Sequence, residues 1–169
     1  MKKKKRIAYI PVSIIVHALF LLTVYTFQGM IFPHIRIFGL VPLLLPIVVT
    51  GAAIFEGRDT GGIFGLFAGI LCDLALNEPI GVFTVLLTVV GLVVGSLADN
   101  VLSRSFLSFY ITSFFVLSIC ATVQMFPLLF FAEIPIGALF MVAVRQTLYS
   151  MLFAFPLYFF VRVLPRTGV

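Results

Sequence analysis

The chain has 169 residues, of which 62% are hydrophobic and 10% are charged, whereas about 25% of the residues in ordinary soluble domains are charged. One membrane-spanning helix uses roughly 20 apolar residues, so five or six spans would occupy nearly the whole chain and leave no room for a soluble catalytic domain. The net charge of +5 does not indicate nucleic-acid binding, because five of the eleven basic residues form the N-terminal run 2–6 and the others are scattered.

The first apolar segment, residues 7–28, directly follows the basic run 2–6. A secretory signal peptide has a shorter apolar region and an A-x-A-like cleavage site, whereas this segment ends in Thr26-Phe27-Gln28-Gly29. We therefore expect a retained first span. The run 2–6 is expected to anchor the start of this span in the cytoplasm and to be attracted to anionic membrane lipid.

The second apolar segment, residues 41–55, is short for a span, and Pro42 and Pro46 lie near its start. Because proline removes a backbone donor and obstructs the preceding helical turn, we expect this span to be tilted, kinked or partly unwound. The preceding connection, residues 29–40, is too apolar for an ordinary loop and too interrupted by glycine and proline for a span. It predicts a short interfacial or re-entrant piece.

Four further apolar segments follow, over residues 61–76, 80–98, 106–131 and 137–163. Basic residues favour cytoplasmic loops, and six spans with a cytoplasmic N-terminus place nine of the eleven on that side. These nine are Lys2, Lys3, Lys4, Lys5, Arg6, Arg58, Arg104, Arg162 and Arg166. Five spans would move one charged end outside. The sequence therefore predicts one all-α domain over residues 1–169, a bundle of six transmembrane helices with both termini cytoplasmic.

Small and polar residues recur at every fourth position in the middle of the chain: Gly57, Gly61, Gly65, Gly69, Asp73, Asn77 and Gly81. A four-residue step turns a helix by about 400°, so the middle members share one face of the third span. Small residues let two helix backbones approach closely in lipid. This face predicts either packing within the chain or an interface for a partner's helix. Gly91 and Gly95 repeat the spacing, and the fourth span is expected to cross the third there.

Asp73 needs a separate explanation, because a carboxylate at a helix centre in the membrane costs roughly 2.5 to 3.5 kcal/mol and seldom faces lipid. It lies only about one turn from the outer end of its span. Two roles are open: hydrogen bonding to the turn that follows, or an ion pair with Arg145 in the last span. Gln124 and Gln146 lie at a similar depth. We expect a buried polar cluster of Asp73, Asn77, Gln124 and Arg145, with Gln146 close by.

No catalytic or metal-binding motif accompanies these residues. The sequence has no nucleophile motif, paired carboxylates or P-loop. Cys72 and Cys120 lie in apolar segments without the spacing of metal ligands. We therefore expect no enzymatic activity, no cofactor and no metal.

The stretch GLFAGILCDLALNEPIG resembles the rod-shape-determining protein MreD family. The resemblance lies in Gly65-x3-Gly69-x3-Asp73-x7-Gly81, the pattern of the family's central helix and the turn after it. Pro42, and a final helix with an internal proline (Pro156) and a basic end, agree more weakly.

The resemblance implies a non-catalytic subunit in the inner membrane of a bacterium, part of the elongation machinery that inserts side-wall peptidoglycan. Members of the family associate with MreC, a single-span protein, and through it with the side-wall transpeptidase, the glycosyltransferase and MreB filaments. Their fold is thought to resemble the substrate-binding subunits of energy-coupling-factor transporters. That likeness implies an alternative function, a transporter subunit in which Asp73, Gln124 and Arg145 line a vitamin-sized pocket.

Overall fold

The computed structural model describes residues 16, 18–31, 34, 40–76, 81–100, 105–131 and 135–163. The first described helix, Ala18–Met30, is apolar and ends in the π-helical turn η1 (Phe27–Ile31). The helices that follow are α2 (Leu45–Glu56), α3 (Arg58–Leu76), α4 (Val82–Asn100), α5 (Phe106–Phe131) and α6 (Ile136–Val163). The all-α class predicted from the sequence is confirmed.

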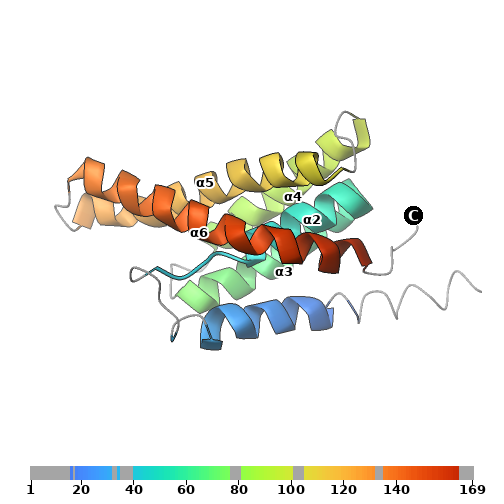
Figure 1. Cartoon of the computed structure of the whole chain (residues 1–169), viewed down its shortest axis with the longest axis horizontal. Coiled ribbons are helices and arrows are strands. Elements are labelled where there is room, and N and C mark those ends of the chain that lie inside the picture. The colour runs from blue at the N-terminus through green and yellow to red at the C-terminus, as the bar shows by residue number, and fades with distance from the viewer. Residues whose placement is uncertain are drawn as a thin grey trace, which may run out of the picture.

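Successive helices run in alternate directions along the long axis of the molecule, and α6 ends at the same end at which the first helix begins (Figure 1). α2 lies at the centre, where it contacts α3, α4, α5 and α6. Its residues from Leu45 to Phe55 are all buried. The most extensive contacts join α3 to α4 and α5 to α6. The fold is thus two helical hairpins packed around one central helix.

Three of the described helical segments are long and apolar enough to cross a membrane: Val82–Asn100, Phe106–Phe126 and Ile136–Val163. The first helix and α2 are apolar but shorter. Large apolar side chains also cover the outer surface, where Val85, Phe115 and Leu152 are 61% to 69% exposed. Contiguous exposed apolar surface of this kind is typical of helices that face lipid.

α2 is too short to cross a membrane by itself, because its 12 residues rise only about 18 Å. The chain before it, residues 41–44, is not helical, and Figure 1 draws it as an extended stretch that leads into the middle of the bundle. Pro42 disfavours helix in the residue before it, and Pro46 stands in the first turn of α2, where its missing N–H costs nothing. The predicted partial unwinding of the second span corresponds to this extended stretch.

Candidate functional site

α3 and α4 approach each other so closely that glycine is required at their contact. A Cβ atom on Gly65 would overlap the carbonyl oxygen of Leu87, and a Cβ on Gly69 would lie 2.7 Å from the carbonyl oxygen of Phe83. Both obstacles are backbone atoms of α4, which a side-chain rotation cannot move. Contact between backbones is the way in which helices gain van der Waals attraction in lipid.

The same contact continues toward the start of α3. A Cβ on Gly61 would lie 2.8 Å from the carbonyl oxygen of Gly91, and a Cβ on Gly95 would lie 2.7 Å from the backbone nitrogen of Arg58. Each four-residue step along α3 therefore meets a four-residue step backward along α4. The structure places Gly61, Gly65, Gly69, Gly91 and Gly95 inside one hairpin. Of the two roles open for the glycine face, the structure shows packing within the chain.

Asp73 lies at the end of this hairpin where α3 ends and α4 begins. It is 2% exposed, and its oxygens accept hydrogen bonds from the backbone N–H groups of Gly81 (2.9 Å), Phe83 (2.8 Å) and Thr84 (3.2 Å). The hydroxyl of Thr84 donates a fourth bond at 2.7 Å. The first N–H groups of a helix have no partner within the helix and favour negative charge, so a carboxylate on α3 satisfies the N-terminus of α4.

Gly81 has a φ of 111°, which glycine adopts without a steric penalty. The Gly-Gly-Asp-Gly pattern that carries the resemblance thus has one structural role. Gly65 and Gly69 let α4 approach, Asp73 caps its first turn, and Gly81 makes the reversal between the helices.

At the other end of the hairpin, Asp99 on α4 is hydrogen-bonded to the start of α3. This role of Asp99 was not predicted from the sequence. Its carboxylate accepts a hydrogen bond from the backbone N–H of Arg58, the first residue of α3, at 3.4 Å. The backbone of Gly57, with a φ of 94°, lies so close that an added Cβ would be 3.1 Å from Oδ1 of Asp99. The sequence held no separate signal for this contact, because it depends on the register that sets Gly61 opposite Gly91.

The predicted cluster around Asp73 and Arg145 divides into separate parts in the structure. All the hydrogen-bond donors to Asp73 belong to the turn and first residues of α4, whereas Arg145 is exposed on α6. Within the described part of the chain, the expected Asp73–Arg145 ion pair is therefore replaced by the helix cap. Gln124 lies elsewhere, accepting a hydrogen bond from Nε2 of Gln146 at 3.0 Å. Asn77 lies outside the described residues.

A second set of buried polar groups surrounds the extended stretch before α2. Oε1 of Gln28 accepts hydrogen bonds from the N–H groups of Leu44 (2.8 Å) and Leu45 (3.1 Å). The hydroxyl of Ser150 accepts one from Leu43 at 2.9 Å, and the amide of Gln146 donates to the carbonyl of Val41 at 3.2 Å. Non-helical backbone is tolerated at membrane depth only where protein or water satisfies it. These side chains from the first helix and α6 satisfy it here.

A Gln28→Leu variant is expected to melt at a clearly lower temperature in detergent than the parent. Two buried N–H groups would lose their acceptor, and each orphaned group costs about 1–3 kcal/mol. Thr26→Val is the matched control, because the Thr26 hydroxyl is exposed and bonds only to Leu22 of its own helix, at 2.8 Å. Equal melting temperatures for Gln28→Leu and the parent would show that α2 does not need this cap.

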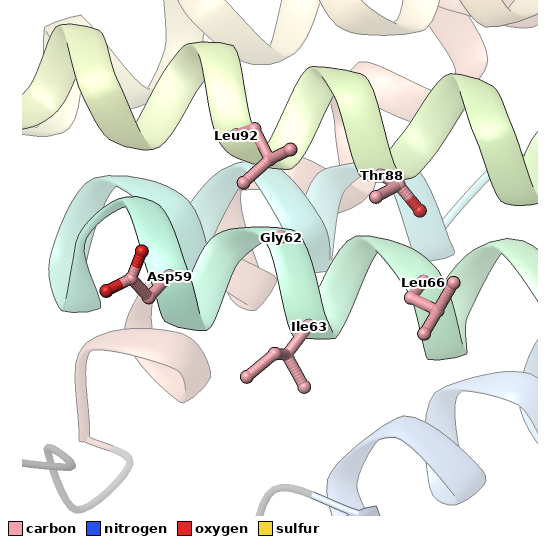
Figure 2. A pocket seen from close by; sticks show the side chains of 6 residues that line it. All are labelled: Asp59, Gly62, Ile63, Leu66, Thr88 and Leu92. Carbon is pink, nitrogen blue, oxygen red and sulfur yellow. The ribbon is translucent and has the colours of Figure 1, made fainter.

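A shallow groove of about 370 Å³ lies on the outer side of the α3–α4 hairpin. Figure 2 shows the six residues that line it, contributed by both helices: Asp59, Gly62, Ile63, Leu66, Thr88 and Leu92. The lining is mostly apolar and does not include Asp73, Gln124 or Arg145. Among the described residues, no group of histidine, cysteine, aspartate and glutamate side chains is arranged to hold a metal ion.

The family indicated by the Gly-Gly-Asp-Gly pattern of this hairpin is also the one whose model matches the chain. The family described as rod shape-determining protein MreD matches residues 9–167, nearly the whole chain. The chain belongs to the MreD family. MreD proteins are non-catalytic, shape-determining membrane proteins, so the expectation that this chain is not an enzyme is confirmed.

Membership in the MreD family also establishes the role in rod shape and the multi-pass membrane location that the apolar helices indicate. No curated protein and no solved structure matches the chain. The expected likeness of this MreD chain to the substrate-binding subunits of energy-coupling-factor transporters therefore receives no support.

Proposed function

We propose that this protein is a six-span, non-catalytic scaffold of the bacterial rod complex, and that it binds an MreC-like single-span protein by helix-to-helix contact. Through that partner it would be linked to the side-wall transpeptidase, the glycosyltransferase and MreB filaments. The proposal is supported by the match to the MreD family over residues 9–167. It is also supported by the amount of apolar helix surface that remains exposed on α3 to α6.

The proposed topology has both termini in the cytoplasm of a bacterium. Six described helices that alternate in direction bring the end of α6 back to the side on which the first helix begins (Figure 1). The second crossing combines α2 with the extended stretch before it, since about 18 Å of helix and about 3.3 Å for each extended residue together approach the roughly 30 Å of a bilayer core. The basic residues then lie mainly inside, as the positive-inside rule requires.

One observation favours a scaffold over a binding subunit: buried polar side chains form hydrogen bonds within the protein and do not line the groove of the α3–α4 hairpin. Asp73 and Gln28 accept hydrogen bonds from helix N-termini, and Gln146 bonds to Val41 and Gln124. These side chains hold the backbone in place and do not line the groove between α3 and α4. Intermolecular contact is then left to the apolar outer faces of the helices.

Depletion of the protein in its native bacterium is expected to turn rods into rounded, wider cells. Tagged protein purified from native membranes in mild detergent is expected to retain the MreC-like protein, and an unrelated single-span protein expressed at the same level is the control. Cell width by microscopy and the retained partner by immunoblot are the measurements. Rods of normal width after depletion, or a tightly bound small molecule in place of the partner, would contradict the scaffold.

A further inference from the structure

The groove on the outer side of the α3–α4 hairpin is a surface that lipid or another helix must cover. Ile63 and Leu66 form its α3 side and are 58% and 41% exposed. Thr88 presents little polarity to it, because its hydroxyl already donates to the carbonyl of Thr84 at 2.6 Å. Gly62 adds no side chain of its own, and the Leu92 side chain lies against it (Figure 2).

Asp59 stands at the end of this groove where α3 begins, and it is exposed. The chain has three aspartates, and the other two, Asp73 and Asp99, both accept hydrogen bonds from helix N-termini within the hairpin. Asp59 makes no hydrogen bond or ion pair with any residue that the structure describes. Among the six lining residues Asp59 has the one charged side chain, so a carboxylate marks this end of an otherwise apolar groove.

In the proposed topology this corner lies at the cytoplasmic surface. A single-span helix whose N-terminus is cytoplasmic carries lysine or arginine at the same level, because of the positive-inside rule. We infer that the groove receives the transmembrane helix of such a partner, with a basic residue at its cytoplasmic end paired to Asp59. This inference rests on the proposed function and adds the surface and the charge rule by which the partner would be recognised.

Two other occupants fit the observations less well. An anionic lipid headgroup would be repelled by Asp59. A second copy also has a basic run, residues 2–6, before its first span in the sequence, but the inner side chains of its first helix, Leu21 and Val24, are already buried against its own bundle. A free single-span helix can lie along the whole groove without moving another bundle.

The charge rule is tested with Asp59→Lys. Like charges across an interface cost several kcal/mol, so we expect the variant to retain the MreC-like protein at least about tenfold less well in co-purification. Replacing the partner's basic residue at the cytoplasmic boundary with aspartate should restore retention. Val163→Lys is the matched control: it adds a cation to an 82% exposed position at the end of α6 and should leave retention unchanged.

Location is tested independently by a photo-crosslinking amino acid at Ile63, with Leu148 on α6, 60% exposed, as the control position. An adduct with the MreC-like protein from Ile63 and none from Leu148 is the expected result. The inference is overturned by an adduct from Leu148 alone, by an adduct between two copies of this chain, or by the absence of any adduct from Ile63.

The two proposals fail in distinguishable ways. If the partner co-purifies with the parent but Asp59→Lys retains it fully, the groove assignment is wrong and the scaffold function stands. If the parent itself retains no MreC-like protein, the proposed function is wrong, and the inference falls with it. Because Asp59→Lys could weaken folding, its melting temperature is measured beside that of Asp59→Asn, and rescue by the partner's opposite charge separates recognition from stability.

Discussion

A Gly65→Ala variant is expected to accumulate at a small fraction of the parent's level and to melt well below it in detergent. The added methyl group would overlap the carbonyl oxygen of Leu87 and would lie 2.9 Å from Cα of Thr88. These atoms belong to the backbone of α4, so the whole helix would have to move away. Overpacking costs about 1–3 kcal/mol, and the separation also removes the van der Waals contact that joins helices in lipid.

Gly62→Ala is the matched control on the same helix. Its added methyl would meet only the end of the Leu92 side chain, 2.6 Å from Cδ2, which can rotate away. Gly137→Ala is a second control, since an added Cβ there meets nothing within 4 Å. Immunoblots of membranes and melting curves of purified protein give the comparison. If Gly62→Ala and Gly65→Ala lose stability equally, close approach of the two backbones is not what holds the hairpin.

The glycine face could be predicted from the sequence because the face of a helix follows from residue number alone. The neighbour that covers this face was indicated only by the repeat of the spacing at Gly91 and Gly95 in the fourth span. Packing within the chain and packing on a partner both require small residues, and only the tertiary structure shows Gly61 opposite Gly91. The structure confirms that the fourth span crosses the third at Gly91 and Gly95 and shows which residues of the two faces meet.

Of the two roles that the sequence left open for Asp73, the structure shows hydrogen bonding to the turn and the start of α4, and not the ion pair with Arg145. Position along a span gives the depth of a residue in the membrane, but the direction in which it points depends on how the helices pack. Asp73 points to the start of α4, whereas α6, which carries Arg145, packs mainly on α5 and α2. Residues at one depth can therefore lie on different sides of the bundle.

The caps of α2 were beyond sequence reasoning because they join distant parts of the chain. Leu44 bonds to Gln28, 16 positions away, and Leu43 bonds to Ser150, 107 positions away. The prolines near α2 indicated unwinding, and unwound backbone in a membrane must find hydrogen-bond partners. The sequence thus implied that partners exist, while their identity depended on the fold.

Three kinds of contact hold α3 and α4 together. Glycines bring the two backbones together, Asp73 on α3 caps α4, and Asp99 on α4 bonds to the start of α3. A helix pair held along its length and at both ends resists sliding and separation. Such rigidity would favour the docking of a partner helix that we propose for the groove beside Asp59.

An Asp73→Leu variant is expected to lose folded protein and to leave cells rounded when it replaces the parent. Three backbone N–H groups and the Thr84 hydroxyl would lose their acceptor. At about 1–3 kcal/mol for each orphaned group, the loss is comparable with the whole stability of a typical domain, about 5–15 kcal/mol. Asp73→Asn keeps one acceptor oxygen but turns an amide NH₂ toward N–H donors, so an intermediate loss is expected.

Charge exchange separates this cap from an ion pair with Arg145. If Asp73 acts as the cap of α4, Asp73→Arg combined with Arg145→Asp should be as defective as Asp73→Arg alone. The reason is that a guanidinium is only a donor and cannot accept from Gly81, Phe83 and Thr84 wherever the negative charge is placed. Protein levels in membranes and cell width measure the outcome. Recovery in the double variant would mean that the interaction with Arg145, rather than the cap, makes a carboxylate necessary at this depth.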